Sequence, residues 1–441
     1  MPKTARVPLA TAGLLLGMLL SVLDQTVVAI ALPDIAADLG GLEAIGWIVT
    51  SYVLASTATG ALYGRLSDRY GRRAVFVTSA AVFVAGSALS GLAQTLPQLI
   101  VARTVQGIGA GALFVLPAIA LSELYPARLR SRVQGFTGGV FALAGVGGPL
   151  AGGAITDVWG WRWIFYVNLP LGLLSMALTA FALRLPRNGE SGRVDLAGAA
   201  LIAGALVSLL LVTEGHALSA GVSAAVLGAL FVWWERRAAD PLLPPRLFTH
   251  RALRVALPAT ALLGALLGGS VVYLPTFLQA AYGMGATQAG LGLIPYVLAL
   301  MAASSLAGAR IGASGRFKPY LLAGSILAVT AFLLLGRITP GTPYPLVAVV
   351  IGVLGAGFGL LMQNLVVVAQ NAVPPTDLAA ATSAVMTVRG LGLSLGVAVF
   401  GALLARRLQD GVPIAEAVPD VLVWGAPAAA VLAVLLALLP G

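Results

Sequence analysis

Two residues of opposite charge stand inside long apolar segments of this chain. Asp24 follows two turns of apolar residues, and Arg103 lies in another apolar run with Gln106 and Gly107 three and four positions later. Residues at that spacing share one face of a helix. An acid that is removed from water binds a proton more readily, and a cation beside it favours release. The two residues therefore predict a proton-exchange site, at which Asp24 could also attract a cationic substrate. The alternatives are a structural acid paired with a neighbour and an arginine that binds backbone carbonyls.

Other polar side chains in apolar surroundings are candidates to line a substrate cavity. Arg389 is flanked by Thr387, Gly390 and Gly392, and three amides lie in comparable segments. The candidate set is Asp24, Gln279, Gln363, Asn364 and Arg389. Ordinary hydrogen bonds between helices are the alternative for the amides.

The composition places these residues in a membrane. Of 441 residues, 59% are hydrophobic and 10% are charged, and the mean hydropathy is +0.97, whereas soluble domains contain about 25% charged residues. Residues 255–309 contain no Asp, Glu, Lys or Arg, and a spanning helix needs about 20 apolar residues. The runs are continuously apolar, unlike the alternating strands of a membrane barrel. The sequence therefore predicts an all-α polytopic membrane protein.

The apolar segments predict fourteen transmembrane helices. They lie at 8–32, 45–63, 74–94, 98–121, 133–156, 163–183, 195–213, 217–234, 254–281, 287–309, 319–336, 344–370, 379–405 and 420–439. With a cytoplasmic N-terminus, 20 of the 26 Lys and Arg residues lie on the cytoplasmic side and four outside, as the positive-inside rule requires. Both termini are therefore predicted to be cytoplasmic. The same rule accounts for the net charge of +10 without nucleic acid. Arg406 and Arg407 are predicted outside, and a missed or extra helix near 370–420 would move them.

A loop sequence occurs twice. Residues 64–73 read GRLSDRYGRR and residues 308–316 read GARIGASGR, with glycines seven positions apart and an arginine after each second glycine. Gly312 stands in the second copy where the first has Asp68. Each loop follows the second helix of a six-helix block, and parallel repeats of this kind are a known transporter architecture. We therefore predict a six-helix bundle at 1–186, an inserted helix pair with linkers at 187–250, and a second six-helix bundle at 251–441.

These motifs resemble the major facilitator superfamily, specifically its 14-helix drug:proton antiporter branch. The resemblance covers nearly the whole chain. It includes LDQTVV at 23–28, with Ala29 where the branch usually has Asn, RTVQG at 103–107, GPLAGG at 148–153, and WRWIF at 161–165 with Asn168 and Pro170. The resemblance implies a major-facilitator-like fold and a role for Arg103 in proton coupling with Asp24.

The resemblance also implies a cytoplasmic gate and an antiporter motif. The gate residues are Gly64, Asp68, Arg69, Gly71, Arg72, Arg73 and Glu123. Asp68 is expected to face the positive end of a neighbouring helix, and Arg72 or Arg73 to meet Glu123. The motif residues Gly148, Pro149, Gly152 and Gly153 are expected to bend their helix and let it pack closely against a neighbour. The implied function of this motif is to prevent leaks. For the arginines of the Gly64–Arg73 loop, the alternative role is only to set the membrane topology.

The rest of the composition argues against catalysis, metal binding and direct use of ATP. The chain has no cysteine and only two histidines, His216 and His250, so no nucleophile–base pair or metal site is expected. No phosphate-binding loop is present for direct use of ATP. We therefore expect no enzyme activity, cofactor or metal.

The prediction is a proton-coupled antiporter for multidrug efflux. It would export lipophilic, cationic or amphipathic compounds by alternating access, conferring drug resistance, as a monomer in a bacterial cytoplasmic (inner) membrane. Its partners would be small lipophilic substrates, protons and the lipid bilayer. The alternatives are a dedicated exporter of a lipid or metabolite with the same fold, and a passive channel.

Overall fold

The computed structural model describes residues 3–40, 46–185, 195–211, 217–238, 241 and 245–439, and within them every regular element is a helix. The α-helices are α1 (Lys3–Leu39), α2 (Gly46–Tyr70), α3 (Arg72–Leu92), α4 (Leu96–Leu124), α5 (Ala127–Trp159), α6 (Trp163–Tyr166), α7 (Asn168–Ala182), α8 (Leu196–Leu211), α9 (Ala217–Glu235), α10 (Arg251–Tyr282), α11 (Ala286–Gly292), α12 (Ile294–Ser314), α13 (Lys318–Leu335), α14 (Tyr344–Asn371), α15 (Leu378–Gln409), α16 (Ile414–Leu422) and α17 (Gly425–Ala437). Two 3₁₀ turns, η3 (Pro245–Thr249) and η4 (Pro375–Asp377), precede α10 and α15.

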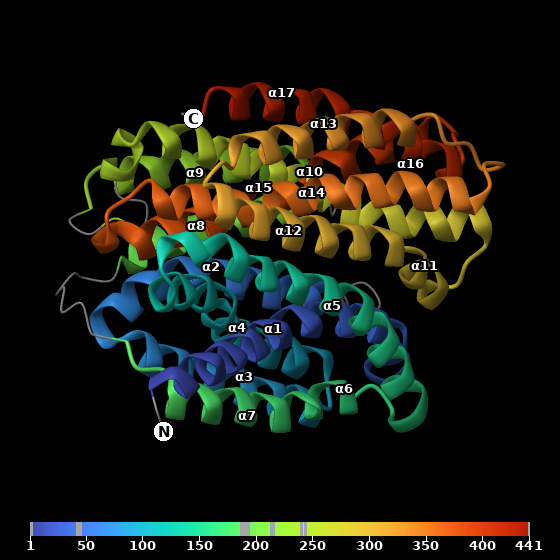
Figure 1. Ribbon diagram of the computed structural model, residues 1–441. Helices are drawn as coiled ribbons and strands as arrows, with labels where there is room; N and C mark the ends of the chain where they lie inside the picture. The colour runs from blue at the N-terminus through green and yellow to red at the C-terminus, as the bar shows by residue number, and fades with distance from the viewer. Residues whose placement is uncertain are drawn as a thin grey trace.

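The helices form two bundles that lie side by side (Figure 1). We call α1–α7 the first bundle and α10–α17 the second bundle. They meet where α5 packs on α12 and α2 packs on α15. The pair α8 and α9 pack on each other, and α8 also contacts both α2 and α15. The boundary predicted at 186–187 lies outside the described residues.

The number of spans differs from the prediction. Helices occupy all fourteen predicted segments, but within the described residues ten are long and apolar enough to cross a membrane. An eleventh results if the two arms of α5, Gly135–Gly145 and Leu150–Trp159, count as one span bent by 40°. Among the others, α2 is long but rich in Ser, Thr and Tyr, and α8 covers 16 residues. The count of fourteen spans is therefore not confirmed, whereas the all-helical membrane fold is.

The two repeated loops have the same backbone feature. Gly71, between α2 and α3, has φ 89°, and Gly315, between α12 and α13, has φ 70°. Side chains strongly disfavour this region of φ, so glycine is needed at both turns. The shared conformation supports an internal repeat.

At one end of the molecule the two bundles share a hydrophobic core. One cluster combines first-bundle residues such as Leu113 and Leu116 with Val366 and with residues 378–386 of the second bundle. Toward the other end of the first bundle, a cluster that includes Val27, Ile48 and Phe165 consists of first-bundle residues alone, among those that the structure describes. The shared end is the one that carries the Gly64–Arg73 loop.

Candidate functional site

Asp24 and Arg103 form a buried ion pair between α1 and α4. Their exposed fractions are 2% and 0%, and Nη1 of Arg103 contacts Oδ2 of Asp24. Arg103 also donates from Nε to the backbone oxygen of Ile48 (3.2 Å) and from Nη1 to Oε1 of Gln106 (2.7 Å). The guanidinium carbon lies 4.1 Å from the centre of the Tyr52 ring, within cation–π range. The structure therefore brings the two predicted proton-coupling residues together.

The second oxygen of Asp24 accepts two further hydrogen bonds. Gln106 Nε2 donates to Oδ1 at 2.9 Å and Asn168 Nδ2 at 2.7 Å. Both amides also donate to the Ser87 hydroxyl, at 3.1 and 3.0 Å, and this hydroxyl donates to the backbone oxygen of Phe165 at 2.9 Å. Every partner of the carboxylate is a donor. The carboxylate oxygens thus accept from one guanidinium and two amide groups.

Glycines let the helices approach closely enough to build this cluster. A Cβ built on Gly86 of α3 would lie 2.5 Å from the backbone of Gln106, and one on Gly107 would lie 2.5 Å from the backbone oxygen of Tyr52. Such distances exclude a side chain, as at other close helix contacts in membranes. Arg103 lies seven residues after the start of α4, or about 10 Å along the helix.

The helix-5 motif packs on the turn of α1 next to Asp24. A Cβ on Gly148 would overlap the Thr26 side chain, and one on Gly152 would come within 3.2 Å of Val27 Cα. Thr26 donates from Oγ1 to the Ala144 backbone oxygen at 3.1 Å. The bend of α5 lies between its arms 135–145 and 150–159, the interval that contains Gly148. The structure therefore shows close packing at Gly148 and Gly152 and a bend in the same interval, while the role of the motif in antiport stays a prediction.

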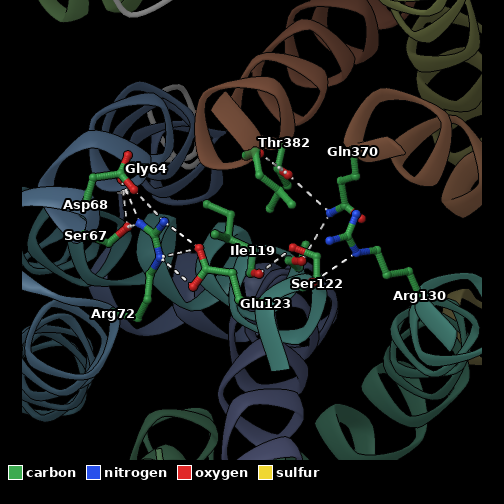
Figure 2. A network of polar contacts seen from close by, with 12 residues as sticks. Gly64, Ser67, Asp68, Arg72, Ile119, Ser122, Glu123, Arg130, Gln370 and Thr382 are labelled. Carbon is green, nitrogen blue, oxygen red and sulfur yellow. Dashed lines mark hydrogen bonds and ion pairs between the residues drawn. The ribbon is translucent and has the colours of Figure 1, made fainter. Parts of the chain in front are cut away.

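A second polar network lies at the end where the bundles join (Figure 2). Arg72 is 4% exposed and forms ion pairs with Asp68 (2.5 Å) and Glu123 (2.7 Å). It also donates to the Gly64 backbone oxygen at 3.3 Å and to the Ser67 hydroxyl. The expected contact of Arg72 with Glu123 is present. This network ties α2, α3 and α4 to one another inside the first bundle.

The other predicted gate residues have different surroundings. Asp68 bonds to Arg72, and among the described residues the structure shows no hydrogen bond from the first turn of α15 to Asp68. Arg73 is exposed, and the Arg69 guanidinium carbon lies 5.3 Å from the centre of the Tyr70 ring. Only Arg72 of the two candidate arginines reaches Glu123. A gating role for this set remains a prediction.

Direct contacts between the bundles lie beside this network (Figure 2). Gln370 of α14 donates from Nε2 to the Ala118 backbone oxygen and to the Thr382 hydroxyl, each at 3.2 Å. Arg130 of α5 donates to Oδ1 of Asn371 at 3.2 Å. Gly64 of α2 packs on α15, where a built Cβ would lie 3.1 Å from Ser383 Cβ. These contacts close the interface at this end.

The predicted cavity residues separate into two groups. Gln363, Asn364 and Arg389 are buried in the second bundle, whereas Gln279 is exposed. Asn364 donates to the Leu360 backbone oxygen of its own helix at 2.6 Å. Both amide atoms of Gln363 and Nη1 of Arg389 are buried without a hydrogen-bond partner. Asp24, the fifth predicted cavity residue, is separate from all of these, because its partners all lie in the first bundle.

Charged residues also form contacts at the opposite end of the bundles. Arg406 and Arg407 lie at the end of α15 that is remote from Leu378, and Arg407 is 3.5 Å from Asp420. Asp38 accepts from Arg162 (2.7 Å) and from Trp161 Nε1 (3.1 Å), so the WRWIF motif holds the end of α1. These hydrogen bonds, with that from Arg162 foremost, lower the pKa of Asp38.

Sequence reasoning assigned no role to three members of the Asp24 cluster. Ser87, Tyr52 and Asn168 are buried polar residues on α3, α2 and α7. Ser87 and Tyr52 have no signal in the sequence beyond a polar residue in an apolar run, which many hydroxyl residues of this chain share, and Asn168 was noted only as part of the family resemblance.

Comparison with known proteins agrees with this architecture. Residues 14–397 match the family model described as Major Facilitator Superfamily. The chain is 34% identical to multidrug resistance protein 3 of Bacillus subtilis, over 90% of this chain and 80% of that protein. It is 39% identical to an uncharacterised MFS-type transporter of Mycobacterium tuberculosis, over 90% of this chain but 59% of that protein, so it spans about three-fifths of that relative's length.

Solved structures share the fold. A crystal structure of the human organic anion transporter MFSD10 superposes with a TM-score of 0.75 at 18% identity, over 99% of this chain and 100% of that one. The proton:xylose symporter XylE superposes with a TM-score of 0.68 at 16% identity, over 98% and 95%. The bundle pair thus defines a membrane transporter fold. The chain belongs to the Major Facilitator Superfamily.

Proposed function

We propose that the chain is a proton-coupled antiporter that exports lipophilic, cationic or amphipathic compounds by alternating access. The observation that carries the proposal is the buried Asp24–Arg103 ion pair. Ionisable residues inside a membrane are costly and mark proton or substrate pathways. The names of the Bacillus subtilis relatives, multidrug resistance protein 3 and multidrug transporter protein MdtP (31% identical), support export of drugs.

The hydrogen bonds of Asp24 suggest how protonation would drive a conformational change. Three donors, one of them the Arg103 guanidinium, contact the carboxylate. Proton uptake would remove the counter-ion of Arg103, whose Nη2 already lacks a hydrogen-bond partner. A buried charge that loses its partner destabilises the packing around it. Protonation therefore favours a second arrangement of α1 and α4, and deprotonation restores this one.

The conformation supports an outward-facing assignment in a cell membrane. Positive residues concentrate at the end where the bundles join, the end predicted to be cytoplasmic. The shared core and the hydrogen bond from Gln370 to the Ala118 backbone oxygen support closure at that end, which suits release of a proton-exchanged substrate to the outside. Under this assignment Arg72, Asp68 and Glu123 stiffen the first bundle where Gly64 meets the second one.

A transport experiment tests the proposal. The protein is reconstituted into liposomes, and ethidium uptake is measured with an imposed pH gradient, without one, and with a proton ionophore. We expect accumulation against the ethidium gradient only when the pH gradient is present. Equilibration at the same rate under all three conditions would indicate a passive channel. Absence of movement of ethidium and of other drugs would favour a dedicated exporter.

A further inference from the structure

Arg389 is a buried cation without a counter-ion. It lies in the middle of α15, 5% exposed, and within the described residues no acid forms an ion pair with it. Nη2 donates to the Met386 sulfur at 2.9 Å, a weak acceptor. Nη1 is buried without a hydrogen-bond partner. The other buried arginines have acidic counter-ions, Asp24 for Arg103 and both Asp68 and Glu123 for Arg72, so Arg389 differs from them in kind.

The guanidinium of Arg389 faces the first bundle across the interface. Its central carbon lies 5.8 Å from the Phe114 ring centre and 5.7 Å from that of Phe141. The two rings meet edge to face at 5.6 Å. Arg389 comes from the second bundle and both rings from the first, on α4 and α5. Relative motion of the bundles would therefore change the separation of Arg389 from the two rings.

Further unsatisfied polar atoms lie one turn along α5 from Phe141. A Cβ built on Gly138 would approach Ser304 Oγ to 2.6 Å and Gln363 Cγ to 3.6 Å. The Ser304 hydroxyl and both amide atoms of Gln363 are buried without hydrogen-bond partners. Gly138 and Phe141 are three residues apart, so they share one face of α5. Arg389, Gln363 and Ser304 of the second bundle thus place unsatisfied polar groups along this face of α5.

Unsatisfied buried groups are costly, and an unpaired buried charge is the most costly of them. A bound molecule could satisfy all of these atoms at once. A carboxylate on this molecule would complement the donors of the Arg389 guanidinium. Its aromatic rings would pack on the faces of Phe114 and Phe141. Its other polar atoms would bond to the Gln363 amide and the Ser304 hydroxyl.

We infer that Arg389 binds the carboxylate of an amphipathic aromatic substrate, with Phe114 and Phe141 packing on its rings and Gln363 and Ser304 bonding its polar atoms. The inference rests on the proposed function, since it assumes that the transported compound binds between the bundles. Within the amphipathic class it adds a preference for compounds that carry an anionic group over their uncharged analogues. Binding would replace the Met386 sulfur by a carboxylate oxygen.

A binding experiment without any gradient tests the inference. Tritiated 2-naphthoate and its uncharged amide, 2-naphthamide, are titrated onto the full chain in lipid nanodiscs. We expect naphthoate to bind more tightly by about tenfold or more, which corresponds to about 1.4 kcal/mol. In Arg389→Gln the preference should vanish, and in Arg389→Lys part of it should remain, because the charge survives without the fork. Arg337→Gln, at an exposed arginine, is the matched control and should leave the preference unchanged.

Equal affinities for the two probes, no binding of naphthoate, or a preference that persists in Arg389→Gln would each overturn the inference. Circular dichroism and the thermal unfolding midpoint establish that each variant is folded. The inference and the proposed function fail separately. An Arg389-dependent preference without proton-driven transport contradicts the proposed function alone. Proton-driven drug export without this preference contradicts the inference alone.

Discussion

Gly148 of α5 packs directly against Thr26 of α1, two residues from the acid that we assign to proton coupling. A Cβ on Gly148 would overlap the Thr26 side chain. The Thr26 hydroxyl also donates to the α5 backbone at Ala144. The helix-5 motif therefore packs on the α1 turn that presents Asp24 to Arg103.

Replacing Gly148 should disturb proton coupling through this contact. Gly148→Ala places a methyl group into Thr26, and overpacking of this kind costs about 1–3 kcal/mol. We expect a lower thermal unfolding midpoint and a loss of pH-gradient-driven drug uptake in proteoliposomes. Gly147→Ala is the control, because a Cβ there has no neighbour within 4 Å. If both alanine variants behave alike, the Gly148–Thr26 contact does not set the position of α1.

The buried ion pair should be measurable as a coupling energy. Arg103→Ala leaves Asp24 buried without a counter-ion, so it should lower the free energy of unfolding by about 3–5 kcal/mol. Asp24→Asn combined with Arg103→Ala should cost less than the sum of the two single changes, because the uncompensated charge is gone. Unfolding in increasing fractions of SDS, followed by circular dichroism, measures all three variants. Additive losses would mean that the residues do not interact.

The bundle contact at Gly64 should control closure of the cytoplasmic end. Gly64→Ala pushes against Ser383, so the closed state should lose population. Spin labels on cysteines introduced at the exposed Arg73 and Arg316, one on each bundle, should then report longer distances. Ser383→Gly in the Gly64→Ala background removes the obstructing side chain and should restore the short distances. Distances that stay the same in Gly64→Ala would place closure elsewhere.

The orientation in the membrane can be tested with single cysteines, because the natural chain contains none. Ser314 and Thr339 are exposed residues at opposite ends of α13. In intact cells a membrane-impermeant maleimide should label Thr339→Cys and leave Ser314→Cys unlabelled. In inverted vesicles the pattern should reverse. The reverse pattern in intact cells would overturn the cytoplasmic assignment of the Gly64–Arg73 end.

Much of the fold could be predicted from the sequence, because long apolar runs in a membrane have few alternatives to helices. The glycine turns at Gly71 and Gly315 were also predictable, since both loops carry the same pattern. The number of spans was not predictable. Because α2 contains many polar residues and α8 is short, length and hydropathy do not decide whether either helix crosses a membrane.

The site was predicted only in part. Asp24 and Arg103 are conspicuous as charges in apolar runs, but their pairing joins positions 79 residues apart, which periodicity does not reveal. Asp68 was expected to face the N-terminus of a neighbouring helix. In the structure it pairs with Arg72, because this side chain lies only four residues further along the chain. The unpaired state of Arg389 depends on which residues of the other bundle face it, and these are two aromatic rings instead of acids.

The central claim, that Asp24 carries the exchanged proton, is tested most directly by substrate-induced proton flux. Wild type and Asp24→Asn, both verified as folded, are reconstituted with a pH-sensitive dye inside the liposomes. Addition of ethidium should produce a proton flux with the wild type and none with Asp24→Asn, because an amide keeps the shape of the side chain but cannot ionise. Arg103→Lys should retain part of the flux, since the charge remains while the bond to the Ile48 oxygen is lost. Undiminished flux and gradient-driven export by Asp24→Asn would contradict the account.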